Sequence, residues 1–68
     1  MTTHIKLNGQ PYELATNQTI ATLIDTLGLA GKRYAVEIND NILPRSQHHT
    51  RHLVDGDCVE IVHAIGGG

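Results

Sequence analysis

The stretch that decides the fold is CVEIVHAIGGG, residues 58–68. Its apolar run Val59–Ile65 predicts a buried strand, because a short run rich in β-branched residues after a turn signal is typical of strands in a core. The glycine triplet 66–68 has no Cβ atoms, so it accepts almost any backbone angle and reaches roughly 10 Å when extended. We therefore expect a folded domain over 1–65 and a flexible glycine tail over 66–68.

The terminal carboxylate of Gly68 is the candidate working group of the chain. Gly66 and Gly67 before it carry no side chain, so the thin arm that they form can enter a narrow channel in another protein. A glycine run is also typical of linkers and disordered termini. The hypothesis therefore depends on the rest of the chain.

The composition favours a small module that acts through partners and is not an enzyme. The chain has 68 residues with no Trp or Phe, so its core must be aliphatic and is hard to shape into an enzyme pocket. A net charge of -2 gives no electrostatic basis for binding nucleic acid. The single cysteine favours a reducing, cytoplasmic compartment. No segment resembles a signal peptide or a membrane span, so we expect no membrane partner.

Residues 4–14 predict an antiparallel hairpin. His4–Leu7 alternates between polar and apolar residues, and the alternation resumes over Pro11–Leu14. Asn8-Gly9 between them is typical of a tight hairpin turn, because both central residues of that turn need a positive φ.

A helix is expected to begin after Thr19, which suits the N-cap position. Gly28 suits the C′ position that ends the helix. The loop 28–33 does not match a phosphate-binding pattern. The apolar positions of the helix form one stripe with the spacing i, i+3, i+4 and i+7, which predicts a core face: Ile20, Leu23, Ile24 and Leu27.

The second half of the chain predicts two or three further strands. Ala35–Ile38 alternates, a turn follows over 39–41, and Ile42-Leu43 is long enough only for an edge strand before Pro44. We expect a polar loop with at most one helical turn, then a tight turn, and then a last strand that lies centrally and parallel to the first. The fold class is α+β: a β-grasp (ubiquitin-like) fold, a mixed sheet of four to five strands with one main helix across one face.

Four blocks of the chain agree in order and spacing with one known family. They are AVEIN at Ala35–Asn39, LPRS at Leu43–Ser46, DGDCVEIV at Asp55–Val62, and the terminal Gly67-Gly68. Together they closely resemble the ubiquitin-like sulfur-carrier proteins of thiamine biosynthesis, the ThiS family of the ThiS/MoaD superfamily. The resemblance covers essentially the whole chain.

This resemblance implies a carrier cycle that uses Gly68. A ThiF-like adenylyltransferase, using ATP and Mg²⁺, would convert its carboxylate to an acyl-adenylate. Sulfur derived from a cysteine desulfurase would replace AMP and leave a thiocarboxylate, and a ThiG-like thiazole synthase would take up that sulfur. The chain itself would bind no cofactor or metal. Gly66 and Tyr34 stand where relatives often have other residues, and neither departure touches Gly67-Gly68.

Other functions share this fold and tail. A sulfur carrier for molybdopterin or another sulfur sink would use the same chemistry. A ubiquitin-like protein modifier would form isopeptide bonds with lysines and accumulate as high-mass conjugates. In a regulatory domain cut from a larger β-grasp protein, Gly68 would be an arbitrary end.

The remaining reactive residues are expected to be structural. His48 and His52 would share a face if they were helical, and such pairs can bind zinc, but no further ligand is placed to complete a site. We expect a solvated loop there. Cys58 lies between Asp57 and Glu60, an environment unlike that of reactive thiolates, so we interpret it as a structural thiol.

A partner surface is expected beside the tail. Val62 and Ala64 share one face of the last strand and leave a small apolar spot there, which is typical of interaction sites when charged residues surround it. With Ile65 and Arg45 they are the candidate partner-binding residues, and Arg33 is a further candidate.

Overall fold

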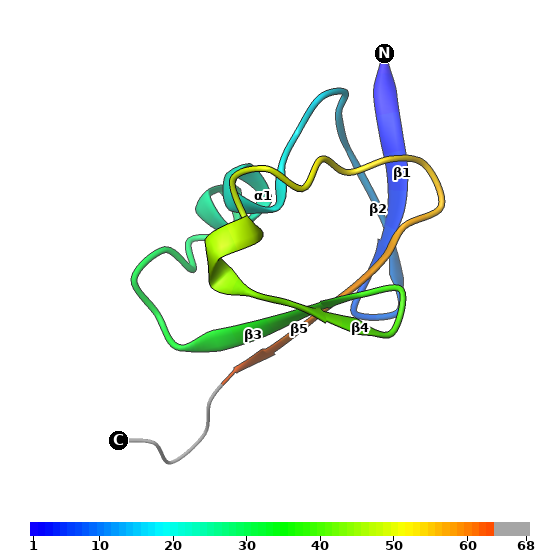
Figure 1. Ribbon diagram of the computed structural model, residues 1–68. Coiled ribbons are helices and arrows are strands. Elements are labelled where there is room, and N and C mark those ends of the chain that lie inside the picture. The colour runs from blue at the N-terminus through cyan, green and yellow to red at the C-terminus, as the bar shows by residue number, and fades with distance from the viewer. Residues whose placement is uncertain (64–68) are drawn as a thin grey trace.

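The structure, a computed structural model, describes residues 1–63 and forms one sheet with a helix on one face (Figure 1). Its strands follow the order β2-β1-β5-β3-β4. The β1–β5 pair is parallel and the other pairs are antiparallel. This confirms the mixed β-grasp sheet and the central last strand. The elements are β1 Thr2–Leu7, β2 Gln10–Ala15, α1 Ile20–Thr26, β3 Tyr34–Ile38, β4 Asn41–Leu43, the 3₁₀ turn η1 Arg45–Gln47 and β5 Cys58–His63.

The first hairpin forms where the sequence predicts it. Asn8 and Gly9 have φ values of 51° and 82°, as a two-residue hairpin turn requires. The turn also lies against β5, because the Asn8 N–H donates to the Val59 carbonyl at 2.8 Å and the Ile61 N–H donates to Asn8 Oδ1 at 2.8 Å. Asn8 therefore continues the β1–β5 pairing beyond the end of β1.

Helix α1 supplies one wall of the core. Its N-cap is Thr19, whose Oγ1 accepts a hydrogen bond from the Thr22 N–H at 3.2 Å, and Gly28 after its end has a φ of 74°. Both predicted boundaries are confirmed. The buried apolar residues come from α1, from the strands β1, β3 and β5, and from the segment before β5: Ile5, Ile20, Leu23, Ile24, Val36, Ile38, Leu53, Val59 and Ile61. Leu27 is only partly buried against this core.

The second hairpin is tighter than the sequence suggests. Its turn is Asn39-Asp40, with φ values of 52° and 70°, and Asn41 already belongs to β4. The predicted edge strand and the single helical turn after it are confirmed as β4 and η1. In Figure 1, α1 and the segment from η1 to β5 lie on the same side of the sheet. The other side carries the exposed positions of β5 and is called the open face below.

Candidate functional site

The central strand β5 fixes the point from which the chain continues toward the tail. It pairs with β1 on one side and with β3 on the other, and its last residue, His63, lies opposite Tyr34. Val59 and Ile61 anchor it in the core with exposed fractions of 1% and 7%. A strand held on both edges and through its inward side chains is a rigid base.

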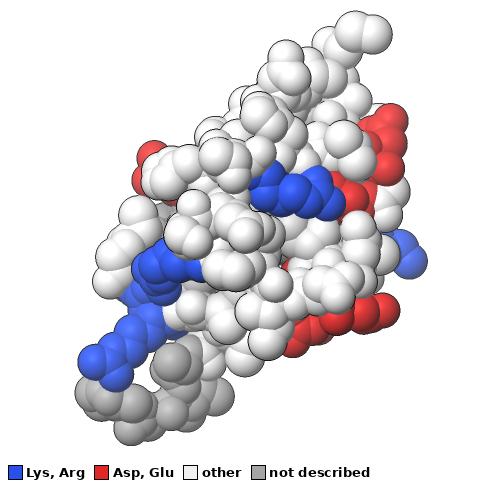
Figure 2. Space-filling view, viewed as in Figure 1, with Lys and Arg blue, Asp and Glu red and all other residues white. Residues whose placement is uncertain are grey.

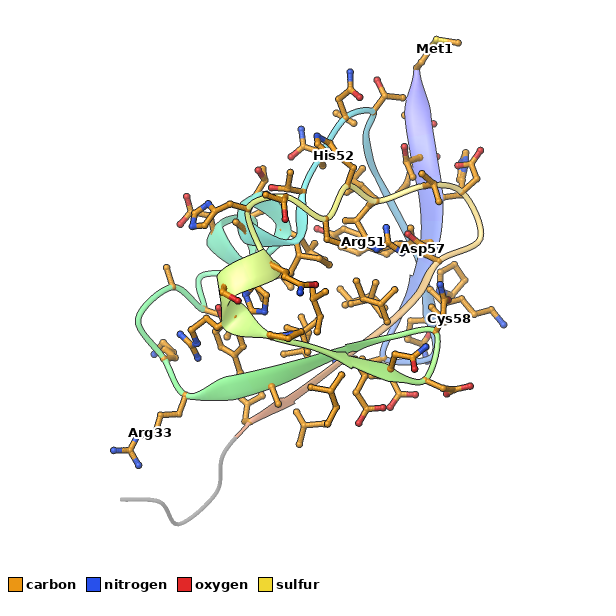
Figure 3. The ribbon with its side chains drawn as sticks, in the orientation of Figure 1. Met1, Arg33, Arg51, His52, Asp57 and Cys58 are labelled. Atoms are coloured by element: carbon orange, nitrogen blue, oxygen red, sulfur yellow. The ribbon has the colours of Figure 1, made fainter. Side chains whose placement is uncertain are left out.

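The start of β5 is fixed by a buried carboxylate, Asp57, which is 4% exposed. Its oxygens accept hydrogen bonds from the Val54 N–H at 3.0 Å and from Asn39 Nδ2 at 3.2 Å, and Arg51 Nη1 lies 3.2 Å from Oδ2. Figure 3 shows Arg51 and Asp57 directed toward one another. Burial alone would raise the pKa of Asp57, but the hydrogen bonds from Val54, Arg51 and Asn39 and the charge of Arg51 together lower it.

Val62 lies on the open face, as the sequence predicts. It is 54% exposed and stands opposite Ala35, which is also exposed. The other apolar candidates, Ala64 and Ile65, and the tail Gly66–Gly68 lie outside the described residues. Their assigned roles therefore stay predictions, and so does the role of Val62 in partner binding.

Arg45 lies beside the same end of the sheet. Its Nη2 donates to the Tyr34 carbonyl at 3.4 Å, and its guanidinium carbon lies 4.6 Å from the centroid of the Tyr34 ring. Since Tyr34 is paired with His63, the structure brings Arg45 close to the end of β5. Arg33 directly precedes β3 at this end (Figure 3). Figure 2 shows a group of Lys and Arg side chains at the lower left, further basic side chains at the centre and at the right edge, and most of the visible Asp and Glu on the right.

The expectation of a solvated histidine loop is wrong for His48. This side chain is 5% exposed, its ring stacks on Tyr34 with centroids 6.0 Å apart, and its Nε2 lies 3.4 Å from the Leu43 carbonyl. Burial lowers the pKa of His48, against a raising effect of the Leu43 hydrogen bond. His48 is buried because the end of η1 packs on α1, where the Ala21 N–H donates to the His48 carbonyl at 2.9 Å.

His52 is exposed, and η1 ends before it, so His48 and His52 do not share a helix. Within residues 1–63, no group of three or more histidine, cysteine or acidic side chains is placed to hold a metal ion. Cys58 is exposed at the start of β5, so its thiol does not contribute to the core. No helix of the described part is long and apolar enough to cross a membrane.

A hollow of about 460 Å³ opens on the side of the sheet that carries α1. Two of its lining residues, Arg45 and His48, are already engaged by backbone carbonyls of Tyr34 and Leu43. These two contacts connect η1 and the residue after it to β3 and β4.

The sequence reasoning missed Glu37 and Ile42 as surface residues of the open face. Glu37 stands directly opposite Glu60 in the β3–β5 pair, and Ile42 stands opposite Glu37 in the β3–β4 pair with 73% of its surface exposed. Alternation along each strand gives the outward direction of these side chains. Their juxtaposition depends on the register between strands, which the alternation does not determine.

The parallel β1–β5 pair at the centre of a five-stranded mixed sheet, with α1 on one face, defines a ubiquitin-like β-grasp protein. The family model described as "ThiS family" matches residues 5–68. The chain belongs to the ThiS family.

Individual relatives agree with this membership. The crystal structure of the thiamine biosynthesis protein (ThiS) from Geobacter metallireducens matches with a TM-score of 0.82 and 29% identity, over 96% of this chain and 99% of that one. Sulfur carrier protein ThiS of Bacillus subtilis is 35% identical, over 94% of this chain and 98% of that protein. Thiazole synthase of Magnetococcus marinus is 38% identical, over 94% of this chain but 20% of that protein.

Proposed function

We propose that this chain carries sulfur for thiamine biosynthesis as a thiocarboxylate on Gly68. The observation that carries the proposal is the family match, which runs through the glycine triplet to Gly68. The ThiS protein of Bacillus subtilis, which matches over nearly its whole length, is named a sulfur carrier. Relatives named for ThiS and for thiazole synthase favour thiamine over molybdopterin as the destination of the sulfur.

The chemistry begins with the activation of the Gly68 carboxylate. A carboxylate exchanges oxygen for sulfur poorly, because oxide is a poor leaving group. A carboxylate oxygen attacks the α-phosphate of ATP, pyrophosphate leaves, and the resulting mixed anhydride carries AMP as a good leaving group. A sulfur nucleophile then attacks the acyl carbon, and AMP departs with the former carboxylate oxygen. Dividing one difficult step into two easier ones is the general advantage of a covalent intermediate.

The partners supply the catalytic groups in this cycle. An adenylyltransferase binds ATP and Mg²⁺ and positions them, and a cysteine desulfurase provides the sulfur as a persulfide. The terminal sulfur of the persulfide attacks the acyl carbon, and a thiol reductant then cleaves the S–S bond of the acyl disulfide and leaves the thiocarboxylate. The thiocarboxylate then donates its sulfur to thiazole synthase. The chain acts as a sulfur carrier and is a substrate of these cytoplasmic enzymes, and it performs no catalysis of its own.

The described part of the chain supports the proposal through the position of β5. This strand is paired on both sides and ends at His63, five residues before Gly68 in the printed sequence. Five extended residues span about 17 Å. A partner that holds the sheet against its surface can therefore receive Gly68 in a recessed active site.

Intact mass spectrometry tests the proposed function. The full chain is incubated with ATP, Mg²⁺, the adenylyltransferase of the same organism, a desulfurase with cysteine, and a thiol reductant. We expect a mass increase equal to the difference between one sulfur and one oxygen, and its loss when Gly68 is deleted. High-mass conjugates in place of this exchange would identify a protein modifier and overturn the proposal.

A further inference from the structure

We propose that the carboxylates of Glu37 and Glu60 bind one cationic side chain, arginine or lysine, of the thiazole synthase. Ile42 and Val62 would make apolar contacts on either side of that cation. This inference rests on the proposed function, because it names the surface through which the carrier meets the enzyme that takes its sulfur.

The two carboxylates are brought together by the strand register. Glu37 of β3 and Glu60 of β5 are direct cross-strand partners in an antiparallel pair. Cβ atoms of such partners lie about 4.5–5.5 Å apart on the same face of a sheet. Neighbouring residues of both strands, Val36 and Ile61, are buried on the other face. Both carboxylates therefore belong to the open face.

This pair is electrostatically unsatisfied in the described part of the chain. Neither Glu37 nor Glu60 forms an ion pair or a side-chain hydrogen bond within residues 1–63, where the ion pairs are His4–Glu13 and Arg51–Asp57. Like charges directly opposite one another destabilise a sheet. A single cation placed between the carboxylates would convert this repulsion into two attractive contacts.

Apolar side chains adjoin the pair on two sides. Ile42, opposite Glu37 on β4, is 73% exposed, and Val62, two positions after Glu60, is 54% exposed. A charged pair surrounded by apolar surface that becomes buried on docking is less screened than one in water. A partner that covers Ile42 and Val62 would therefore strengthen the contact between its cation and the two carboxylates.

The thiazole synthase is the partner that the comparisons favour. In the Magnetococcus marinus protein named thiazole synthase, a segment similar to this chain makes up 20% of the length. Covalent linkage keeps such a segment near the rest of its protein at a high effective concentration. Where carrier and synthase are separate chains, a docking surface on the carrier would take the place of this linkage. The open face suits this role because Glu60 and Val62 lie on β5, the strand that leads toward Gly68.

The test uses the full unloaded chain and the separate thiazole synthase of the same organism. Glu37→Gln, Glu60→Gln and the double variant are compared with Asp25→Asn, which removes the same charge from an exposed position on α1. Dissociation constants are measured by calorimetry at low and high salt. We expect about a tenfold or larger loss of affinity for the double variant, with a weaker salt dependence, and no change for Asp25→Asn.

A second measurement separates docking from a structural role. Removing either like charge should raise the urea midpoint of the free chain, because the cross-strand repulsion is relieved. Glu60→Lys should raise it further by pairing with Glu37, and should bind the synthase more weakly than Glu60→Gln. Stability and affinity therefore change in opposite directions, which a purely structural pair would not produce.

An unchanged dissociation constant and salt dependence for the double variant would overturn this inference. It would also be overturned if the double variant were loaded more slowly by the adenylyltransferase while its affinity for the synthase stayed the same. In both cases sulfur loading of the unaltered chain, measured by mass, would leave the proposed carrier function standing.

Discussion

Replacing Asp57 with asparagine should destabilise the base of β5 strongly. The carboxylate is 4% exposed and accepts from the Val54 N–H, from Asn39 and from Arg51. An asparagine amide would turn one acceptor into a donor that faces the donors of Asn39 and Arg51. The substitution therefore removes the charge and also introduces a mismatch of hydrogen bonds.

The expected loss in the free energy of unfolding is a large part of the total stability of the domain. A hydrogen bond to a charged group contributes about 1.5–3 kcal/mol, and losing its partner in a buried site costs a similar amount. The Arg51 side chain is 32% exposed, so solvent screens part of its attraction. We expect Asp57→Asn to lower the free energy of unfolding by about 2–3 kcal/mol, whereas a domain of this size rarely has more than ~3–5 kcal/mol.

The lowered pKa of Asp57 predicts how the destabilisation by Asp57→Asn changes with pH. Because the net effect of burial and hydrogen bonding lowers the pKa of Asp57, the folded state favours the carboxylate. Its stabilisation is complete above the ordinary aspartate pKa and is lost as the pH falls through the pKa of the folded state. The difference in stability between the original chain and Asp57→Asn should therefore be largest near pH 7 and should shrink in strong acid.

Urea unfolding followed by circular dichroism at several pH values measures this difference, with Asp25→Asn on the exposed face of α1 as the matched control. The control should unfold within about 0.5 kcal/mol of the original chain. If Asp57→Asn behaves like the control at pH 7, or if its destabilisation persists unchanged in strong acid, the reasoning from the Asp57 network is refuted.

Three further predictions follow from individual side chains. Lowering the pH through the ordinary histidine range should destabilise the fold through His48. Burial lowers the pKa of its ring, so the unfolded chain binds the proton more readily. The unfolding temperature of a chain with His48→Phe should fall less between pH 7.5 and 5.5 than that of the original chain. Val62→Asp should weaken binding to the adenylyltransferase about tenfold while circular dichroism stays unchanged, since the side chain is 54% exposed; unfolding of this variant would assign Val62 to the core. Cys58→Ser should retain full sulfur loading on Gly68 in the mass assay, and complete loss of loading would give the thiol a direct role.

Local signals were sufficient to predict most of the fold. Asn8-Gly9 predicts the first turn, Thr19 and Gly28 predict the ends of α1, and Val59 with Ile61 predict the inward face of β5, and the structure confirms each of them. These features depend on residues close together in the chain, whose conformational preferences act within one turn or one strand.

The features that could not be predicted depend on contacts between distant segments. His48 is buried because Tyr34 and α1 meet around it, and a polar stretch gives no local sign of such packing. The pairing of Glu37 with Glu60 depends on the β3–β5 register, which side-chain alternation leaves undetermined. The tail stays a prediction on chemical grounds, since its residues lie outside those that the structure describes.

The place of β5 in the sheet has a consequence for the folding of the chain during its synthesis on the ribosome. Within residues 1–63, the β1–β2 hairpin and the β3–β4 hairpin join into one sheet only through β5, which follows the other four strands in the chain. Until it emerges from the exit tunnel, the two hairpins lack their common neighbour and the apolar face of α1 lacks Val59 and Ile61. A nascent chain that stalls before β5 therefore offers proteases an incomplete sheet.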